Sequence, residues 1–198
     1  MISNSDAKSK SALGFLTVVE HPQYGLFGGY LVLTLAGRPL EFHCTAPIKP
    51  NRAQEILYGP TLESFLYGEQ IGQTLIQQAS IPPMLICTDQ EPALAAREYA
   101  SAPVVLVLPP PNEGVAGQTD GLQIVGDSSR VLRLDAAHRG PRLVSFELGR
   151  NRLALPEQAE EDRRLITERL ADLADSFDLA EPFHRIRDAI EEAQQAVR

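Results

Sequence analysis

The sequence predicts an α/β fold of the α+β kind, built on a mixed sheet. Three observations support this: strand-like segments separated by turn residues fill residues 13–47, helical and apolar strand-like segments alternate over 61–108, and short strand-like segments precede two amphipathic stretches in 122–198. The first region predicts a three-stranded antiparallel meander, and the second adds a helix-strand-helix-strand unit that completes the mixed sheet. The third predicts a β-meander followed by a pair of C-terminal helices.

The N-terminal meander follows from composition and turn chemistry. Residues 13–47 are rich in Val, Leu, Phe, Tyr and Thr, and the sequences PQYG and AGRP divide them into three strands. The glycine-rich stretch YGLFGGY lacks the following helix and the Lys-Ser/Thr pair of a phosphate-binding loop. It indicates instead a β-bulge or a tight hairpin shoulder.

The middle of the chain alternates helices and buried strands. A helix is expected from Thr61 until just before Ser80, and the apolar run MLICTD follows it. A second helix, EPALAAREYA, then leads to the strand PVVLVL. Because helices separate these last two strands, we expect them to be parallel.

The sequence also predicts how the chain is divided. Residues 1–12 are polar and serine-rich, which predicts a disordered lead, and 109–121 have the proline and glycine density of an exposed linker. The expected units are therefore an α/β core domain at 13–108 and a β-meander with two helices at 122–198.

Composition narrows the functional classes. The 198 residues include 43% hydrophobic and 22% charged residues and carry a formal net charge of −8, without a cluster of Lys and Arg. This charge argues against strong sequence-independent binding to nucleic acid. Two cysteines, no secretion signal and no apolar run long enough to cross a bilayer predict a cytoplasmic protein without a disulfide framework.

Glu69 is the most unusual residue of the first predicted helix. At 100° per residue it falls near the centre of the apolar stripe formed by Leu62, Phe65, Leu66 and Ile76. A buried carboxylate needs a partner, a raised pKa, a metal or access to water. Two alternatives follow: a structural partner such as Arg52, Arg97 or a backbone amide, or a bound metal.

The order of the elements over residues 13–108 is similar to that of the ribonuclease H-like fold. Nucleases of that family place acids on the first strand, on the inward face of the first helix and at the end of the fourth strand, where they ligate two divalent metals. Here Glu20 ends the first strand, with Glu where Asp is usual, and Asp89 ends the fourth. Glu69 is the second acid, and Glu55 is an equally eligible one. The resemblance implies phosphodiester hydrolysis with Mg²⁺ or Mn²⁺.

The main hypothesis from the sequence is nevertheless a non-catalytic one. We find no activated nucleophile, cofactor motif or metal-spaced cluster, whereas aromatic and apolar residues suit a protein interface. These observations predict a binding or regulatory protein that acts through a protein partner or as a homo-oligomer, with no cofactor and no strong nucleic-acid signal. The metal-dependent nuclease or phosphodiesterase is the alternative. The predicted interface residues are Tyr24, Phe27, Tyr30, Phe183, Ile186 and Ile190.

Overall fold

The computed structural model describes residues 12–109, 123–124, 131–133, 142–170 and 177–195. The predicted lead and linker lie almost wholly outside these residues, so their expected properties stay predictions. No helix in the described ranges is long and apolar enough to cross a membrane.

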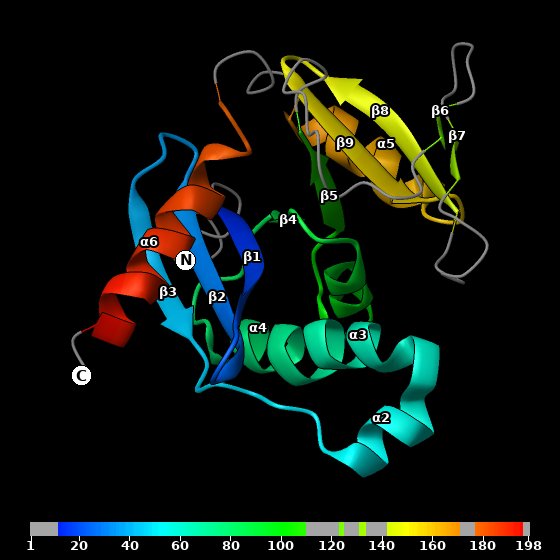
Figure 1. Ribbon diagram of the computed structural model, residues 1–198. Helices are drawn as coiled ribbons and strands as arrows, with labels where there is room; N and C mark the ends of the chain where they lie inside the picture. Colours follow the sequence, from blue (N-terminus) through cyan, green and yellow to red (C-terminus); the bar gives the residue numbers. More distant parts are fainter. Residues whose placement is uncertain (1–11, 110–122, 125–130, 134–141, 171–176, 196–198) are drawn as a thin grey trace.

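Nine strands of the described chain form one mixed sheet in the order β3-β2-β1-β4-β5-β9-β8-β7-β6 (Figure 1). β1 pairs antiparallel with β2 and parallel with β4, and β5 pairs parallel with β4 and antiparallel with β9. The predicted α/β class and mixed sheet are confirmed. The strands are β1 (Ala12–His21), β2 (Gly25–Thr34), β3 (Pro39–Cys44), β4 (Leu85–Thr88), β5 (Val104–Leu108), β6 (Gln123–Ile124), β7 (Val131–Arg133), β8 (Leu143–Leu148) and β9 (Asn151–Pro156).

Helices cover both faces of this sheet. Alternation along β1 sends Leu16 and Val18 into a core shared with η2, α4 and η3, and Leu13 and Phe15 into a second core shared with α5 and α6. The predicted helix after the meander is continuous from α3 to α4, but its middle part, η2, is π-helical. The helical elements are α2 (Arg52–Tyr58), η1 (Gly59–Thr61), α3 (Leu62–Ser64), η2 (Phe65–Gln73), α4 (Thr74–Gln78), η3 (Glu91–Tyr99), α5 (Glu160–Leu170) and α6 (Glu181–Gln195).

Two adjacent glycines of β2 allow helices to approach the sheet closely. A Cβ on Gly28 would lie 2.1 Å from Cγ2 of Ile71 in η2, and one on Gly29 would lie 2.3 Å from Cγ2 of Ile186 in α6. Neither glycine forms a bulge, because the register shift between β2 and β3 lies between Val32 and Leu33. The predicted hairpin shoulder is confirmed at Gly25, which pairs with His21 beside the turn and has φ +94°, whereas close packing and not a bulge explains Gly28 and Gly29.

The helix α6 belongs to the core. Its Phe183 makes an edge-to-face contact with Phe15 of β1, with ring centroids 5.7 Å apart. Phe183, Ile186 and Ile190 are at most 3% exposed, and Tyr30 is fully buried. The prediction that these four side chains meet a protein partner is wrong, because all four are buried in the two cores of the chain itself. Of the other predicted interface residues, Tyr24 is exposed and Phe27 is half-buried.

An ion pair connects η3 to α5. Nε and Nη2 of Arg97 donate to the two carboxylate oxygens of Asp162 at 2.6 and 3.1 Å, and Nη1 donates to the Ala100 carbonyl at 3.0 Å. The hydrogen bond to Asp162 raises the pKa of Arg97, although partial burial acts in the opposite direction. This pairing fixes the end of η3, which begins immediately after the turn that carries Asp89 and Gln90.

Candidate functional site

The candidate site lies where the parallel pairing of β1 and β4 ends, at the carboxyl end of β4 and halfway along β1. Their paired residues run up to Leu16 beside Thr88, so Thr17 and Asp89 are the next residues along the two strands. In open α/β sheets, ligands bind outside the carboxyl ends of the strands. The turn after β4 therefore places Asp89 at the edge where a ligand is expected.

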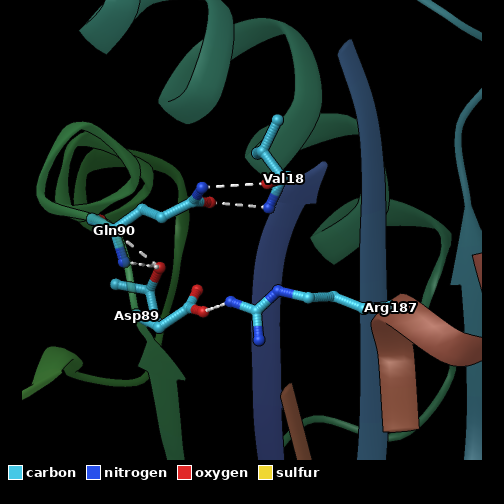
Figure 2. A network of polar contacts seen from close by, with 5 residues as sticks. Val18, Asp89, Gln90 and Arg187 are labelled. Atoms are coloured by element: carbon cyan, nitrogen blue, oxygen red, sulfur yellow. Dashed lines mark hydrogen bonds and ion pairs between the residues drawn. The ribbon is translucent and has the colours of Figure 1, made fainter. Parts of the chain in front are cut away.

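Gln90 fixes this turn to β1. Its side-chain oxygen accepts a hydrogen bond from the Val18 N–H at 2.7 Å, and its amide nitrogen donates to the Val18 carbonyl at 2.8 Å (Figure 2). The hydroxyl of Thr88 also accepts from the Gln90 N–H at 3.3 Å. The side-chain amide thus continues the β1–β4 pairing by one step, and it holds the adjacent Asp89 in place.

Asp89 forms an ion pair with Arg187 of α6. One guanidinium nitrogen of Arg187 donates to Oδ2 of Asp89, and Figure 2 shows the arginine side chain extending from α6 toward the carboxylate. The Asp89 side chain is 16% exposed and that of Arg187 is 40% exposed. The pair therefore sits at the edge of the core, with its cationic end nearer to solvent.

Two buried oxygen atoms at this site, one of them in the ion pair itself, have no hydrogen-bond partner within the described part of the chain. One is Oδ1 of Asp89, and the other is the hydroxyl of Thr17, a residue that is fully buried. Alternation along β1 puts Thr17 on the same face as Phe15, which is the face that α6 covers. Polar atoms thus collect under α6 where the pairing of β1 with β4 ends.

The other two predicted acids lie elsewhere. Glu20 is exposed at the end of β1, and alternation places it on the sheet face opposite to Thr17 and Asp89. The prediction that Glu69 is buried is wrong, because Glu69 is exposed on η2. In a π-helix each N–H bonds five residues back, so the turn holds more residues than an α-helix and the side chains drift out of the 100° phase.

Glu69 has a partner on η3. Partial burial raises the pKa of Tyr99, and the nearby Glu69 carboxylate, which accepts a hydrogen bond from Tyr99, raises it further. The arginines expected to pair with Glu69 have other partners: Arg52 pairs with Glu55 at 2.9 Å, and Arg97 pairs with Asp162. The structural alternative for Glu69 is therefore supported, but with a tyrosine as the partner.

The described acids do not fit a two-metal centre. Among the residues that the structure describes, no three His, Cys, Asp or Glu side chains come together as a metal site. At the strand ends, Asp89 supplies one carboxylate, and its cationic partner is Arg187. The structure thus brings Asp89 together with Arg187, Gln90 and Thr17, whereas Glu20 lies on the opposite face of the sheet. Burial raises the pKa of Tyr67, and the Glu20 and Asp89 carboxylates are both near enough to raise it further.

Arg187 could have been identified from the sequence. It lies four residues after Phe183 and three before Ile190, so helical periodicity places it on the apolar stripe of α6. A charged residue on such a stripe indicates a partner within the fold. The roles of Thr17 and Gln90 have no comparable signal, because they depend on strand register.

Comparison with known proteins gives a fold match without a sequence match. No protein-family model and no curated protein matches the chain. The catalytic domain of human endonuclease V is similar with a TM-score of 0.50 and 12% identity, over 98% of this chain and 89% of that one. Endonuclease V from Bacillus subtilis gives a TM-score of 0.46 and 11% identity, over 96% and 86% of the two chains. Endonuclease V from Ciona intestinalis, in complex with DNA containing an inosine, gives 0.43 and 9%, over 92% and 87%.

These comparisons correct the main hypothesis from the sequence. The similar human domain is the catalytic domain of an endonuclease, which contradicts a non-catalytic protein that acts through protein contacts and favours the ribonuclease H-like alternative. The low weight given to nucleic acid as a partner is corrected by the same fold match, since the similar human domain is that of an endonuclease. The expectation of no cofactor is corrected too, because the nuclease alternative is the one that carries Mg²⁺ or Mn²⁺.

Proposed function

We propose that this chain acts on nucleic acid as a nuclease or phosphodiesterase of the ribonuclease H-like type. The observation that carries the proposal is the near full-length fold similarity to the human endonuclease V catalytic domain, together with the position of Asp89 directly after β4. The cytoplasmic location expected from the sequence is part of the same proposal.

The nucleic-acid strand would lie over the carboxyl end of β4, where its pairing with β1 ends. Arg187 is the cation at this edge whose side chain is partly exposed, so it can contact a backbone phosphate. Arg185 lies on the same helix, where it pairs with Glu181 at 3.7 Å and donates to the Gly37 carbonyl at 3.2 Å. With a net charge of −8, affinity must come from such local cations, and it should fall steeply as salt is added.

Each polar group of the site has a role in this proposal. Gln90 orients the turn, so that Asp89 keeps its position at the strand end. Asp89 is the acid that faces the reacting phosphate, and Arg187 supplies positive charge beside it. Glu20 and Glu69 are exposed and are assigned no catalytic role.

Labelled oligonucleotides test the proposal directly. Single-stranded and duplex DNA and RNA, and a duplex containing an inosine, are incubated with the full chain in Mg²⁺, in Mn²⁺ and in EDTA. We expect salt-sensitive binding by fluorescence anisotropy, and cleavage products on a denaturing gel that EDTA abolishes. No binding to any of these oligonucleotides at low salt would reject the proposal.

Asp89→Asn is the variant that assigns the activity to this site. It should abolish cleavage and leave binding within about twofold of wild type, because Arg187 then becomes free to contact phosphate. Asp188→Asn is the matched control, since it removes the same charge from an exposed residue next to Arg187 on α6. Equal cleavage by the wild type and Asp89→Asn would place the activity elsewhere.

A further inference from the structure

The turn between β1 and β2 carries a cluster of aromatic rings at the surface. The rings of His21 and Tyr24 have their centroids 4.7 Å apart at an interplanar angle of 35°, and His21 also meets Phe27 edge to face at 6.4 Å. His21 and Phe27 are half-buried, whereas Tyr24 is 45% exposed. Because His21 supports one side of the Tyr24 ring, aromatic surface remains exposed on which another ring can stack.

His21 also holds the backbone of this turn. Its Nδ1 accepts hydrogen bonds from the backbone N–H groups of Gln23 and Tyr24, at 3.1 and 3.3 Å. One ring thus fixes the Tyr24 backbone and packs on the Tyr24 side chain. A ligand that stacks on Tyr24 therefore loses little affinity to ordering of the turn.

Lys49 places a positive charge beside the rings. Its ammonium group donates to the Gln23 carbonyl, and the residue is exposed. Leu26 and Ile48 exchange two backbone hydrogen bonds of 2.8 Å, which hold the Lys49 segment against the hairpin. An ammonium group has three donors, so two remain for the phosphate oxygens of a ligand. Aromatic rings beside a positive charge are the combination that binds single-stranded nucleic acid in many proteins.

The rings lie on the same face of the sheet as the candidate site. Alternation along β1 directs Thr17, Val19 and His21 to one side, and Val19 and Phe27 pack against the core that includes α6. Glu20 points to the opposite face, so its charge does not oppose a phosphate here. At ~3.3 Å per strand residue, His21 lies ~13 Å beyond Thr17. A stacked strand covers that distance with ~4 nucleotides at ~3.4 Å each, so one strand can reach both places.

We propose that Tyr24 is a stacking platform for an unpaired nucleobase, and that the chain therefore prefers single-stranded nucleic acid to duplex. An unpaired base can present its face to Tyr24, whereas neighbouring bases cover each base inside a duplex. His21 supports the Tyr24 ring on its other side, and Lys49 binds a phosphate of the same strand. This inference rests on the proposed function, because it names the substrate class of the same protein.

Fluorescence anisotropy with labelled single strands of DNA and RNA tests the platform, in EDTA so that no strand is cleaved. Tyr24→Ala should weaken binding about tenfold, and Tyr24→Phe should stay within about twofold of wild type because it keeps the ring. Tyr24→Leu keeps apolar bulk without an aromatic face, so it should lose as much affinity as the alanine variant. Phe42→Ala is the matched control, since Phe42 is 40% exposed but pairs with Leu31 on another strand, and it should bind as wild type does.

Two further ligands separate stacking from phosphate contact. A strand of the same length without bases should bind wild type and Tyr24→Ala equally, and a blunt-ended duplex should do the same. Lys49→Gln should weaken binding of strands with and without bases. It should also reduce the slope of log affinity against log salt concentration by about 0.7, because one phosphate contact is lost.

The platform is overturned if Tyr24→Ala or Tyr24→Leu binds the single strand as tightly as wild type, or if wild type binds duplex more tightly than single strand. Melting curves show that each variant is folded, and Tyr24→Leu replaces Tyr24→Ala if the alanine variant is not. The two proposals can fail separately. Binding that depends on Tyr24 without any cleavage supports the platform and counts against the nuclease, whereas cleavage that depends on Asp89 but binding that ignores Tyr24 supports the nuclease and overturns the platform.

Discussion

Gln90→Ala should destabilise the fold measurably, because one side chain serves both polar groups of the Val18 peptide. The two hydrogen bonds are 2.7 and 2.8 Å long, and Val18 is 3% exposed. Without the amide, an N–H and a carbonyl lose their partners, at about 1–3 kcal/mol each. Since Gln90 is only half-buried, water can replace part of what is lost, and we expect about 1–1.5 kcal/mol for each group, or about 2–3 kcal/mol in total. For a chain of this length the melting temperature should fall by about 4–12 °C.

Thermal melting and amide hydrogen exchange together test this reasoning. The Val18 N–H should be protected in the wild type and exchange much faster in Gln90→Ala, while amides in the middle of β1 stay protected. Gln77→Ala is the matched control, because Gln77 is exposed on α4 and alanine suits a helix. A Gln90→Ala chain that melts within about 1 °C of wild type and keeps the Val18 amide protected would refute the argument.

Three further predictions concern groups that the fold buries. Arg97→Ala should lower the free energy of unfolding in denaturant by about 2–3 kcal/mol, because it leaves the Asp162 carboxylate, only 12% exposed, without its cation. Asp162→Ala should lower it by about 1–2 kcal/mol, because Arg97 is 44% exposed and can turn to water. Equal losses for the two variants would contradict this reasoning. A thiol reagent should modify the exposed Cys44 and spare the buried Cys87 in the native state. Because burial raises the pKa of Cys87, the free energy of unfolding should fall as the pH rises above about 8.5, where the thiol ionises in the unfolded chain first. A Cys87→Ala chain that shows the same fall would contradict the assignment to Cys87. Gly29→Ala should lower the free energy of unfolding by about 1–3 kcal/mol, because the added methyl group would clash with Ile186 of α6. An unchanged melting temperature would show that the helix can shift freely.

Much of the fold could be predicted because it depends on local chemistry. The strand-like segments of 13–47 and the apolar runs that became β4 and β5 were predicted within a few residues, since β-branched and aromatic residues bounded by turn residues favour strands wherever the chain places them. The parallel pairing of β4 and β5 was predicted as well, because helical connections allow it.

The candidate site was only partly predictable. Asp89 was identified because it directly follows a buried strand, and the ribonuclease H-like resemblance drew attention to that position. The choice of Glu20 on β1 did not allow for register, which places Thr17 beside Asp89 and sends Glu20 to the other face. The choice of Glu69 assumed an ideal α-helix, and the π-helical segment changed the phase of its side chain.

The sequence by itself determined the order and type of most elements, because hydrophobic periodicity and turn chemistry act over a few residues. Only the tertiary structure decided which groups meet at the strand ends. Arg187 is 98 residues from Asp89 along the chain, and its guanidinium reaches the carboxylate because α6 packs on β1 and β2 beside Gly29. The contact depends on helix packing, strand register and side-chain direction at once, and no local pattern encodes all three.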